Sequence, residues 1–449
     1  MKNLKILALS TVLASSLFGL QEQNLDYISM SMGDAGVASS YGSMSAYLNP
    51  ALVNNKDNKR TEIGISAGIG IQEHELGDPL YQLDEAEVGD TLDKIAEGEG
   101  DNEETEYNAN QITDALNKLA QKENYLMLSP TFGLSFKIGR HWSLGVYAMV
   151  NAKAKAVIDS QRLDYISKVT KTFEANGKTY EVDTYVKYDP NAPEGTSDYS
   201  ESDEETYKTT SIEYAMEDLK STYIEVKGIS ITEIPLTYAN NFEALGSVIN
   251  WGISAKYMVG STTSTQILFT DDDYDPADKL DENTVDTTTF GVDAGILIQP
   301  KDSGFKFAIA GKNLNTPEFD VIDGSTYELE PKITAGIAYS ATDMIDITID
   351  YDLTELTDEL TNQKYQYVGG GINFHPLTWF SLRAGAKQNI ADDDNYNGTI
   401  YTAGVSFGLK WLQVDAAVQV SENSGNYDGN EIPRYVKANI ALVSKWGDN

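Results

Sequence analysis

Apolar and polar residues alternate strictly along several segments of the chain. Residues 62–72 place isoleucine or alanine at every second position, with glycine, serine and glutamine at most of the others. In residues 344–352, isoleucine and tyrosine alternate with aspartate and threonine, and residues 413–421 alternate in the same way. Successive side chains of a strand point to opposite faces, so this spacing predicts strands with one apolar and one polar face.

Fourteen such segments follow one another along the chain. Several exceed the roughly 9–11 residues with which a tilted strand crosses a bilayer, whereas strands of soluble proteins average about half that length. An even number of strands returns both ends of a barrel to the same side of the membrane. The candidate strands are 61–73, 124–138, 142–158, 221–239, 247–268, 284–299, 304–314, 326–341, 344–354, 364–375, 378–390, 398–410, 412–422 and 432–446.

The connections between these segments alternate in length. Every odd-numbered connection is long, and the longest are 74–123 and 159–220, whereas the even-numbered ones are mostly short, such as 139–141. Long extracellular loops and short periplasmic turns are typical of outer-membrane barrels. The pattern therefore predicts an all-β fold, a transmembrane antiparallel β-barrel of about fourteen strands.

The two longest connections are strongly acidic. Segment 74–123 holds fifteen acidic residues and three lysines. Residues 91–96 and 111–122 have the spacing of amphipathic helices, and a helix-like stretch occupies 212–219. We expect both connections to be extracellular and partly helical or disordered.

The N-terminus has the parts of a secretory signal. Lys2 and Lys5 precede an apolar run over residues 6–20, and acidic residues begin at Glu22. This order predicts a signal peptide over residues 1–19, and a buried N-terminal helix is the alternative. No later segment has 18 consecutive apolar residues, so we expect no transmembrane helix in the mature chain.

Tryptophans fall beside the predicted short turns. Trp142, Trp379 and Trp411 lie next to three of these turns, and Trp446 lies near the C-terminus. Aromatic girdles mark both membrane interfaces of outer-membrane barrels. These tryptophans therefore predict the periplasmic girdle, although strand ends that simply carry aromatic residues would look the same.

Composition excludes several kinds of protein. The net charge is −36, from 69 acidic and 33 basic residues, which argues against a nucleic-acid partner because phosphate binding needs clustered Lys and Arg. The absence of cysteine excludes disulfides, thiolate nucleophiles and cysteine-ligated metals. No catalytic constellation or phosphate-binding loop is found in the sequence. We expect no enzyme activity, no catalytic residues, no cofactor and no metal.

Several short motifs occur in an order that resembles a known family. Residues 31–39 read SMGDAGVAS and residues 47–52 read YLNPAL; GKNL at 311–314, PKITAGIAY at 331–339 and LRAG at 382–385 follow. The N-terminal motifs resemble the FadL-like outer-membrane transport proteins. The whole order resembles more closely the TraF-like family named after a plasmid transfer operon.

The resemblance implies a barrel of about FadL size, spanning residues 61–449, with an N-terminal hatch over residues 20–60 folded into the lumen. Asn49, Pro50 and Ala51 would lie at the hatch, because Pro fixes φ and Asn favours a turn. An ordinary turn entering the first strand is the alternative. The name TraF is shared with a thioredoxin-like conjugation protein, but a chain without cysteine can perform no thiol chemistry.

Four aspartates fall on the polar faces of predicted strands. Asp346, Asp350, Asp352 and Asp415 are therefore candidate lumen-lining residues, which could favour cations in a pore. The alternative is that barrel interiors are polar without being selective.

Residues 271–282 carry carboxylates at the spacing of a calcium loop. However, Pro276 stands where that loop needs glycine, which favours a solvated acidic loop. Residues 393–398 begin with the same spacing and are better interpreted as a polar turn.

Two functions remain open for a protein located in the bacterial outer membrane and in contact with its lipids. One is a FadL-like channel for small hydrophobic molecules. The other is a non-transporting envelope or surface component, which contacts envelope-complex proteins such as those of a conjugal-transfer apparatus. An apolar passage near the hatch would favour the channel, and a blocked lumen beneath ordered loops would favour the second function.

Overall fold

The computed structural model describes residues 24–55, 61–100, 102–175, 178–193, 196–216, 218, 220–268, 283–358, 360–392, 395–408 and 411–446. The predicted signal peptide lies outside these residues, as do the calcium-like spacing at 271–282 and the ends of the predicted hatch, 20–23 and 56–60. Within the described residues, no helix has the length and apolar character needed to cross a membrane.

Fourteen antiparallel strands of the described residues form a closed barrel in which neighbours in the sheet are also neighbours along the chain. The last strand pairs with the first, with Trp446 opposite Thr61, so the sheet has no free edge. The predicted fold class is confirmed. The barrel strands are β1 (Thr61–His74), β2 (Tyr125–Ile138), β3 (Trp142–Val157), β7 (Tyr223–Ala244), β8 (Ser247–Ile267), β9 (Thr284–Pro300), β10 (Phe305–Lys312), β13 (Lys332–Thr342), β14 (Ile345–Asp352), β17 (Tyr367–Leu377), β18 (Phe380–Asn389), β19 (Ile400–Gly408), β20 (Leu412–Ser421) and β23 (Tyr435–Trp446).

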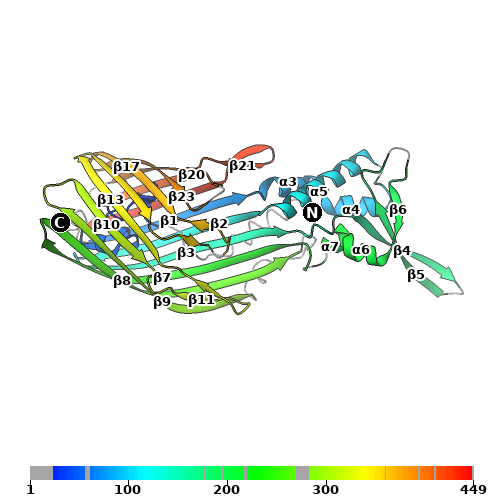
Figure 1. The fold of residues 1–449 in the computed structure, drawn as a ribbon, viewed down its shortest axis with the longest axis horizontal. Helices are drawn as coiled ribbons and strands as arrows, with labels where there is room; N and C mark the ends of the chain where they lie inside the picture. Colours follow the sequence, from blue (N-terminus) through cyan, green and yellow to red (C-terminus); the bar gives the residue numbers. More distant parts are fainter. Residues whose placement is uncertain are drawn as a thin grey trace.

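Short turns gather at one end of the barrel and long connections at the other (Figure 1). Each barrel strand overlaps one predicted segment, but three segments, 326–341, 364–375 and 432–446, begin too early. Their first residues belong to small hairpins at the end of the barrel with the long connections. The prediction included them because the alternation continues from each hairpin into the strand that follows it. These hairpins are β11 (Glu318–Asp320) with β12 (Thr326–Glu328), β15 (Leu356–Thr357) with β16 (Lys364–Tyr365), and β21 (Ser424–Tyr427) with β22 (Asn430–Pro433).

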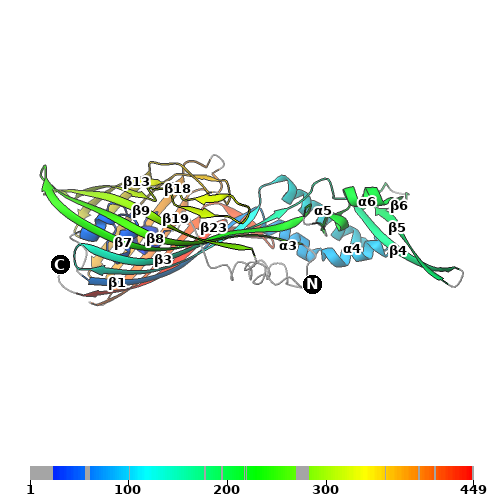
Figure 2. The same ribbon diagram turned by 90° about the horizontal axis from the view of Figure 1, so that it is seen from below.

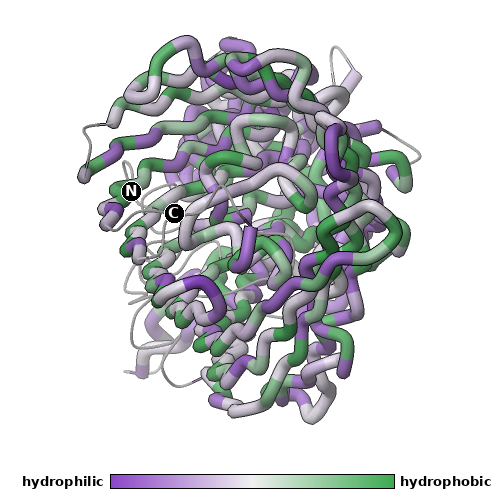
Figure 3. The backbone as a smooth tube through the Cα atoms, turned by 90° about the vertical axis from the view of Figure 1, so that its left-hand side faces the viewer, coloured by the Kyte–Doolittle hydropathy of each residue, from purple (hydrophilic) through white to green (hydrophobic). Residues whose placement is uncertain are grey.

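The two faces of the barrel wall differ in chemistry. On β1, Ile65 and Ile69 are 43% and 48% exposed, whereas Ser66 between them is fully buried. Figure 3, which views the molecule from the end with the short turns, shows hydrophobic and hydrophilic positions alternating along the chain. The outside of the wall is therefore an apolar surface, and the polar side chains fill the interior.

Aromatic side chains are exposed around the end with the short turns. Trp142, Trp379, Trp411 and Trp446 all have large exposed fractions. Tyr238 contacts the Trp142 ring, at 4.8 Å between centroids. This is the arrangement that an aromatic girdle at a membrane interface requires.

The first long connection forms three helices that pack on β3 and β7 at the end of the barrel away from the short turns. Ile112, Leu116 and Leu119, which lie in the amphipathic helix predicted over 111–122, are buried against Ala152 and Ala154 of β3. Figure 2 shows these helices extending beyond the barrel. They are α3 (Gly77–Glu85), α4 (Val88–Ala96) and α5 (Glu103–Gln121).

The second long connection contains a three-stranded sheet that the sequence did not predict. The expectation of helix or disorder over 159–220 is correct only for two short helices. The apolar face of the first strand is interrupted by Lys171, so its alternation is too weak to identify. The elements are β4 (Tyr165–Ala175), β5 (Lys178–Tyr188), β6 (Tyr199–Ser202), α6 (Glu204–Thr210) and α7 (Ile212–Met216).

Ion pairs link the first long connection, residues 74–123, to the rim of the barrel. Glu75, which follows β1, contacts Arg434 at 2.9 Å and Lys122 at 3.0 Å. Burial raises the pKa of the Glu75 carboxyl, but hydrogen bonds from Arg434 and Lys122 outweigh it and leave the pKa below its ordinary value. The carboxylate therefore stays ionised and keeps α3 and α5 anchored to the rim.

Candidate functional site

Residues 24–55 lie inside the barrel, and we call this segment the hatch. Nearly all of its side chains are buried, including Leu25, Ile28 and Met44. Its three short helices pack on the inner faces of β7 to β9, β1, β2, β19, β20 and β23. These helices are α2 (Tyr27–Met30), η1 (Ser43–Tyr47) and η2 (Pro50–Asn54).

The turn at Asn49, Pro50 and Ala51 lies in the hatch and is buried. The Asn49 side chain accepts a hydrogen bond from the Ala51 N–H at 2.9 Å and donates one to the Val37 carbonyl at 2.9 Å. Pro50 opens the short helix that follows, where its missing N–H costs nothing. Asn49 thus fixes the turn at 49–51 to the hatch segment around Val37.

Glycines of the wall allow the hatch backbone to approach closely. A Cβ on Gly252 of β8 would lie 2.4 Å from the Pro50 carbonyl carbon, and one on Gly371 of β17 would lie 2.6 Å from the Met32 Cα. Gly385, in the LRAG motif, meets the Met32–Gly33 backbone in the same way. These positions need glycine because the hatch occupies the space of the missing side chain.

Replacing Gly252 with alanine should displace the turn that begins at Asn49. The added methyl group meets backbone atoms, so the expected cost is about 1–3 kcal/mol of overpacking. The free energy of unfolding in detergent would measure it. Gly408→Ala is the matched control, because its Cβ meets nothing closer than 3.5 Å; equal stability of the two variants would show that the hatch does not rest on Gly252.

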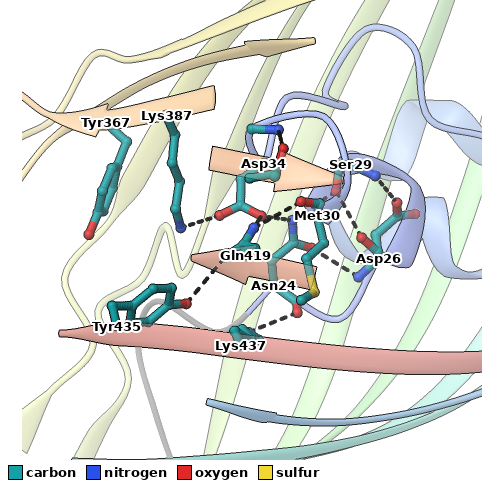
Figure 4. Close-up of polar contacts among 12 residues, drawn as sticks. Asn24, Asp26, Ser29, Met30, Asp34, Tyr367, Lys387, Gln419, Tyr435 and Lys437 are labelled. Carbon is teal, nitrogen blue, oxygen red and sulfur yellow. Dashed lines mark hydrogen bonds and ion pairs between the residues drawn. The ribbon is translucent and has the colours of Figure 1, made fainter. Parts of the chain in front are cut away.

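A polar network fixes the start of the hatch to β18, β20 and β23 (Figure 4). Asp34 pairs with Lys387 and accepts hydrogen bonds from Asn24 and Gln419, at 2.8 and 2.9 Å. Gln419 also donates to the Met30 carbonyl at 2.9 Å. Buried charges are tolerated when they are paired and hydrogen-bonded in this way.

Asp350 holds the middle of the hatch. One of its carboxylate oxygens accepts hydrogen bonds from the Gly36 and Val37 N–H groups, at 2.7 and 2.9 Å. The next inward residue of β14, Thr348, accepts a hydrogen bond from Ser39 at 3.1 Å. The GVA part of the N-terminal motif therefore binds β14 through its backbone.

The other three aspartates that were proposed to line the lumen also have partners within the protein. Asp352 pairs with Lys332 at 3.0 Å, and Asp346 contacts His375 Nε2 at 2.9 Å. Asp415 pairs with Arg383 at 3.3 Å, and both side chains are fully buried. All four side chains thus lie on the interior side of the wall. Each contacts a different partner, so the four carboxylates do not form one site.

Two cavities lie on opposite sides of the hatch. The outer cavity, toward the long connections, has a volume of about 90 Å³ and is lined by Tyr47, Leu48, Lys312, Asp350 and Asp352 among others. The inner cavity, toward the short turns, has about 470 Å³ and is lined by residues including Tyr41, Lys306, Asp346, Thr348 and His375. Along β14 the lining changes from the inner cavity at Thr348 to the outer cavity at Asp350, and the hatch is bound to both residues.

A buried charge cluster lies beside the outer cavity, and sequence analysis did not identify it. Lys256 of β8 contacts Glu233 of β7 at 3.2 Å and Asp293 of β9 at 3.0 Å, and it donates to Asn313 at 2.6 Å. The three charged residues stand on the polar faces of their own strands, but only the register of these neighbouring strands brings them together.

The lumen is covered on its outer side by two loops. Phe319 and Tyr327, from the hairpin of β11 and β12, pack on Ile231 and Met258 of the inner wall. In the second loop, the Leu360 carbonyl accepts a hydrogen bond from Lys153 at 2.9 Å. We call these two loops, residues 313–331 and 353–366, the roof.

Among the described residues, no group of three or more His, Cys, Asp or Glu residues is placed to hold a metal ion. In the segment 393–398, Asn395 and Gly398 adopt positive φ angles of 46° and 64°. The Gly398 N–H donates to the Asn395 carbonyl at 2.9 Å. The described part of this segment is therefore a turn.

The closed fourteen-stranded wall and the folded segment inside it define a hatch-filled β-barrel of the transmembrane type. Residues 46–352 match the family described as "F plasmid transfer operon, TraF, protein". The chain belongs to this family, as its motifs indicated. No curated protein matches the chain.

Several solved structures to which the chain is similar are described as hydrocarbon channels or as a FadL homologue. The toluene transporter TbuX of Ralstonia pickettii has 11% identity and a TM-score of 0.50, over 94% of this chain and 100% of that one. A mutant of the monoaromatic hydrocarbon channel TodX has 10% identity and a TM-score of 0.49, over 95% and 99%. A Pseudomonas aeruginosa FadL homologue has 11% identity and a TM-score of 0.42, over 96% and 99%. The likeness to TbuX establishes the common fold.

Proposed function

We propose that this protein is an outer-membrane channel for small hydrophobic molecules, closed by the hatch. The observation that carries the proposal is the pair of cavities that the hatch separates at Asp350. A movement of the hatch away from Asp350 would join them into one passage. The fold shared with a toluene transporter supports a hydrophobic substrate, and Val37, Leu48 and Ala310 supply apolar lining to the outer cavity.

The apolar outer face and the exposed tryptophans support a position across the outer membrane. In this proposal, residues 1–19 direct export, and the barrel of 61–449 carries the connections 74–123 and 159–220 on the cell surface. The short turns and both ends of the barrel sheet, Thr61 and Trp446, then face the periplasm, as in other outer-membrane barrels.

Replacing Asp350 with alanine tests the proposal. The variant removes the acceptor of two buried backbone N–H groups, and leaving a buried donor without a partner costs about 1–3 kcal/mol. We expect more frequent or larger openings in planar-bilayer recordings of the purified protein. Asp346→Ala is the matched control, because Asp346 is on the same face of β14 but contacts His375 instead of the hatch.

The proposal would be wrong if Asp350→Ala and a chain lacking residues 24–55 both stayed as closed as the wild type. That outcome would favour the alternative, a non-transporting envelope component. The roof and the ordered insertions support this second function, because they cover the lumen on its outer side and offer a structured surface to envelope proteins.

A further inference from the structure

The hairpin of β4 and β5 extends beyond the rest of its sheet. The third strand, β6, pairs only with Tyr185–Tyr188 at the base of the hairpin, and the helices α6 and α7 contact β4 and β5 from one end of the insertion. Figures 1 and 2 both show the distal half projecting away from the helices. The distal half therefore consists of two strands with no third strand beside them. Two strands alone are at best marginally stable in water.

The outer edge of β4 has no partner strand among the described residues, because β4 is the first strand of its sheet. At the base of this edge, Ser211 forms an isolated bridge with Asp164 and donates a hydrogen bond to the Ile166 carbonyl at 2.7 Å. Residues 170–174 are all exposed. Their outward backbone N–H and C=O groups are available to another strand, which is the usual liability of an open edge.

One face of the same hairpin is apolar and exposed. Phe173 stacks on Tyr180 with 5.6 Å between ring centroids, yet the two are 50% and 42% exposed. Val182 is 45% exposed on the same face, and Val169 lies beside it. A further strand that pairs with this edge would pack its own apolar side chains beside these residues on the same face.

We propose that β4 of a second copy of this chain pairs with this edge. Two β4 strands that pair antiparallel about Lys171 place Lys168 opposite Glu174, Val169 opposite Phe173, and Thr170 opposite Thr172. Opposite charges, β-branched–aromatic pairs and Thr–Thr pairs are the favourable cross-strand combinations. Sliding one strand by two residues in either direction loses both the Lys–Glu and the Val–Phe pair.

The pairing has one unfavourable contact, since the two Lys171 side chains meet at the two-fold axis. Like charges directly opposite each other destabilise a strand pair. Lys171→Gln should therefore tighten the dimer. A docking surface for an unrelated protein would give no reason for this gain.

Charge exchange tests the register in the full-length mature protein in detergent, with the dissociation constant measured by sedimentation. Lys168→Glu alone places Glu opposite Glu174 and also removes the 2.8 Å ion pair of Lys168 with Asp183 in the same hairpin. Glu174→Lys alone places Lys opposite Lys168. Each variant should dimerise roughly tenfold more weakly than the wild type. An equimolar mixture of the two should restore dimers, because both cross-strand pairs are then Lys–Glu.

Oxidative cross-linking gives a second test, which does not depend on charge. The chain has no cysteine, so Lys171→Cys introduces a single thiol at the two-fold axis. Paired residues of antiparallel strands lie about 4.5–5.5 Å apart between Cα atoms, within disulfide reach. Lys178→Cys, equally exposed but on β5, is the control and should cross-link far more slowly.

Restored dimers in the mixture and rapid cross-linking at position 171 would establish the pairing. A monomeric wild type, a mixture no tighter than its parts, or equal cross-linking at 171 and 178 would overturn it. These outcomes are independent of channel activity, since β4 lies outside the barrel wall.

Discussion

Replacing Ile349 with arginine should prevent most of the protein from assembling into membranes. Ile349 is 56% exposed on the outer face of β14 and lies opposite Ile337, which is also exposed, on β13. An arginine that faces lipid costs about 2–4 kcal/mol at the bilayer midplane. This is a large share of the net stability of most folded domains. Refolding into liposomes, followed by heat-modifiable migration on gels, would measure the loss.

Asp346→Arg is the matched control because it adds the same side chain to the same strand. Asp346 faces the interior and lines the inner cavity of about 470 Å³, which has room for a longer side chain and water around its charge. We expect this variant to assemble like the wild type. Equal assembly of both variants would contradict a lipid-facing wall, and the reverse result would indicate a register shifted by one residue.

The barrel could be predicted from the sequence because its wall imposes a simple local rule. A residue that faces lipid must be apolar, and its neighbours face a hydrated interior, so hydrophobicity repeats every second position. Ile345 to Asp352 follow this rule without a break, and their faces are as expected. The small hairpins above the wall share the same repeat, which is why β12, β16 and β22 were assigned to the barrel strands that follow them.

The sheet of β4 to β6 was missed because no membrane or core enforces alternation there. Lys171 and Thr184 interrupt the apolar face of the hairpin, and residues on both faces are exposed to solvent. Helix α5 was predicted correctly in its second half because Ile112, Leu116 and Leu119 pack on the barrel and keep a helical spacing. A helix or strand can therefore be predicted from the sequence when one of its sides is buried, because burial imposes a regular spacing of apolar residues.

The hatch has no regular period, and only the resemblance of its motifs located it. Its fixed points are set by contacts between residues more than 300 positions apart, such as Gly36 with Asp350. The same limit applies to the cluster of Lys256, Glu233 and Asp293. Strand register and the path of an irregular segment depend on the whole sheet, so a local pattern cannot specify them.

For the four aspartates, the sequence predicted which face of the strand each side chain lies on, but it did not specify what the carboxylate does there. The alternation of residues 413–421 was sufficient to predict that Asp415 lies on the polar face of β20. A carboxylate inside a barrel lumen then suggested cation selectivity. The structure adds that Asp415 contacts Arg383 and Ser406 and accepts a hydrogen bond from Gln413 at 2.7 Å. A carboxylate held in this way is a structural counter-ion for Arg383.

Replacing Asp415 with alanine should therefore destabilise the barrel strongly. Both side chains of the pair are fully buried, and removing one partner of a buried ion pair typically costs about 3–5 kcal/mol, because it leaves an uncompensated charge. The free energy of unfolding in detergent, from urea titration, would show the loss. The double variant Arg383→Met with Asp415→Ala should recover much of it, since no charge is then left without a partner.

The double variant separates the two roles of Asp415. If Asp415 acts as a counter-ion, its single replacement lowers stability and the second replacement compensates, whereas the ion selectivity of any opened channel changes little. If Asp415 instead serves as a selective pore carboxylate, Asp415→Ala would leave the unfolding free energy unchanged and reduce the preference for cations. Additive losses in the double variant would show that Arg383 and Asp415 do not depend on each other.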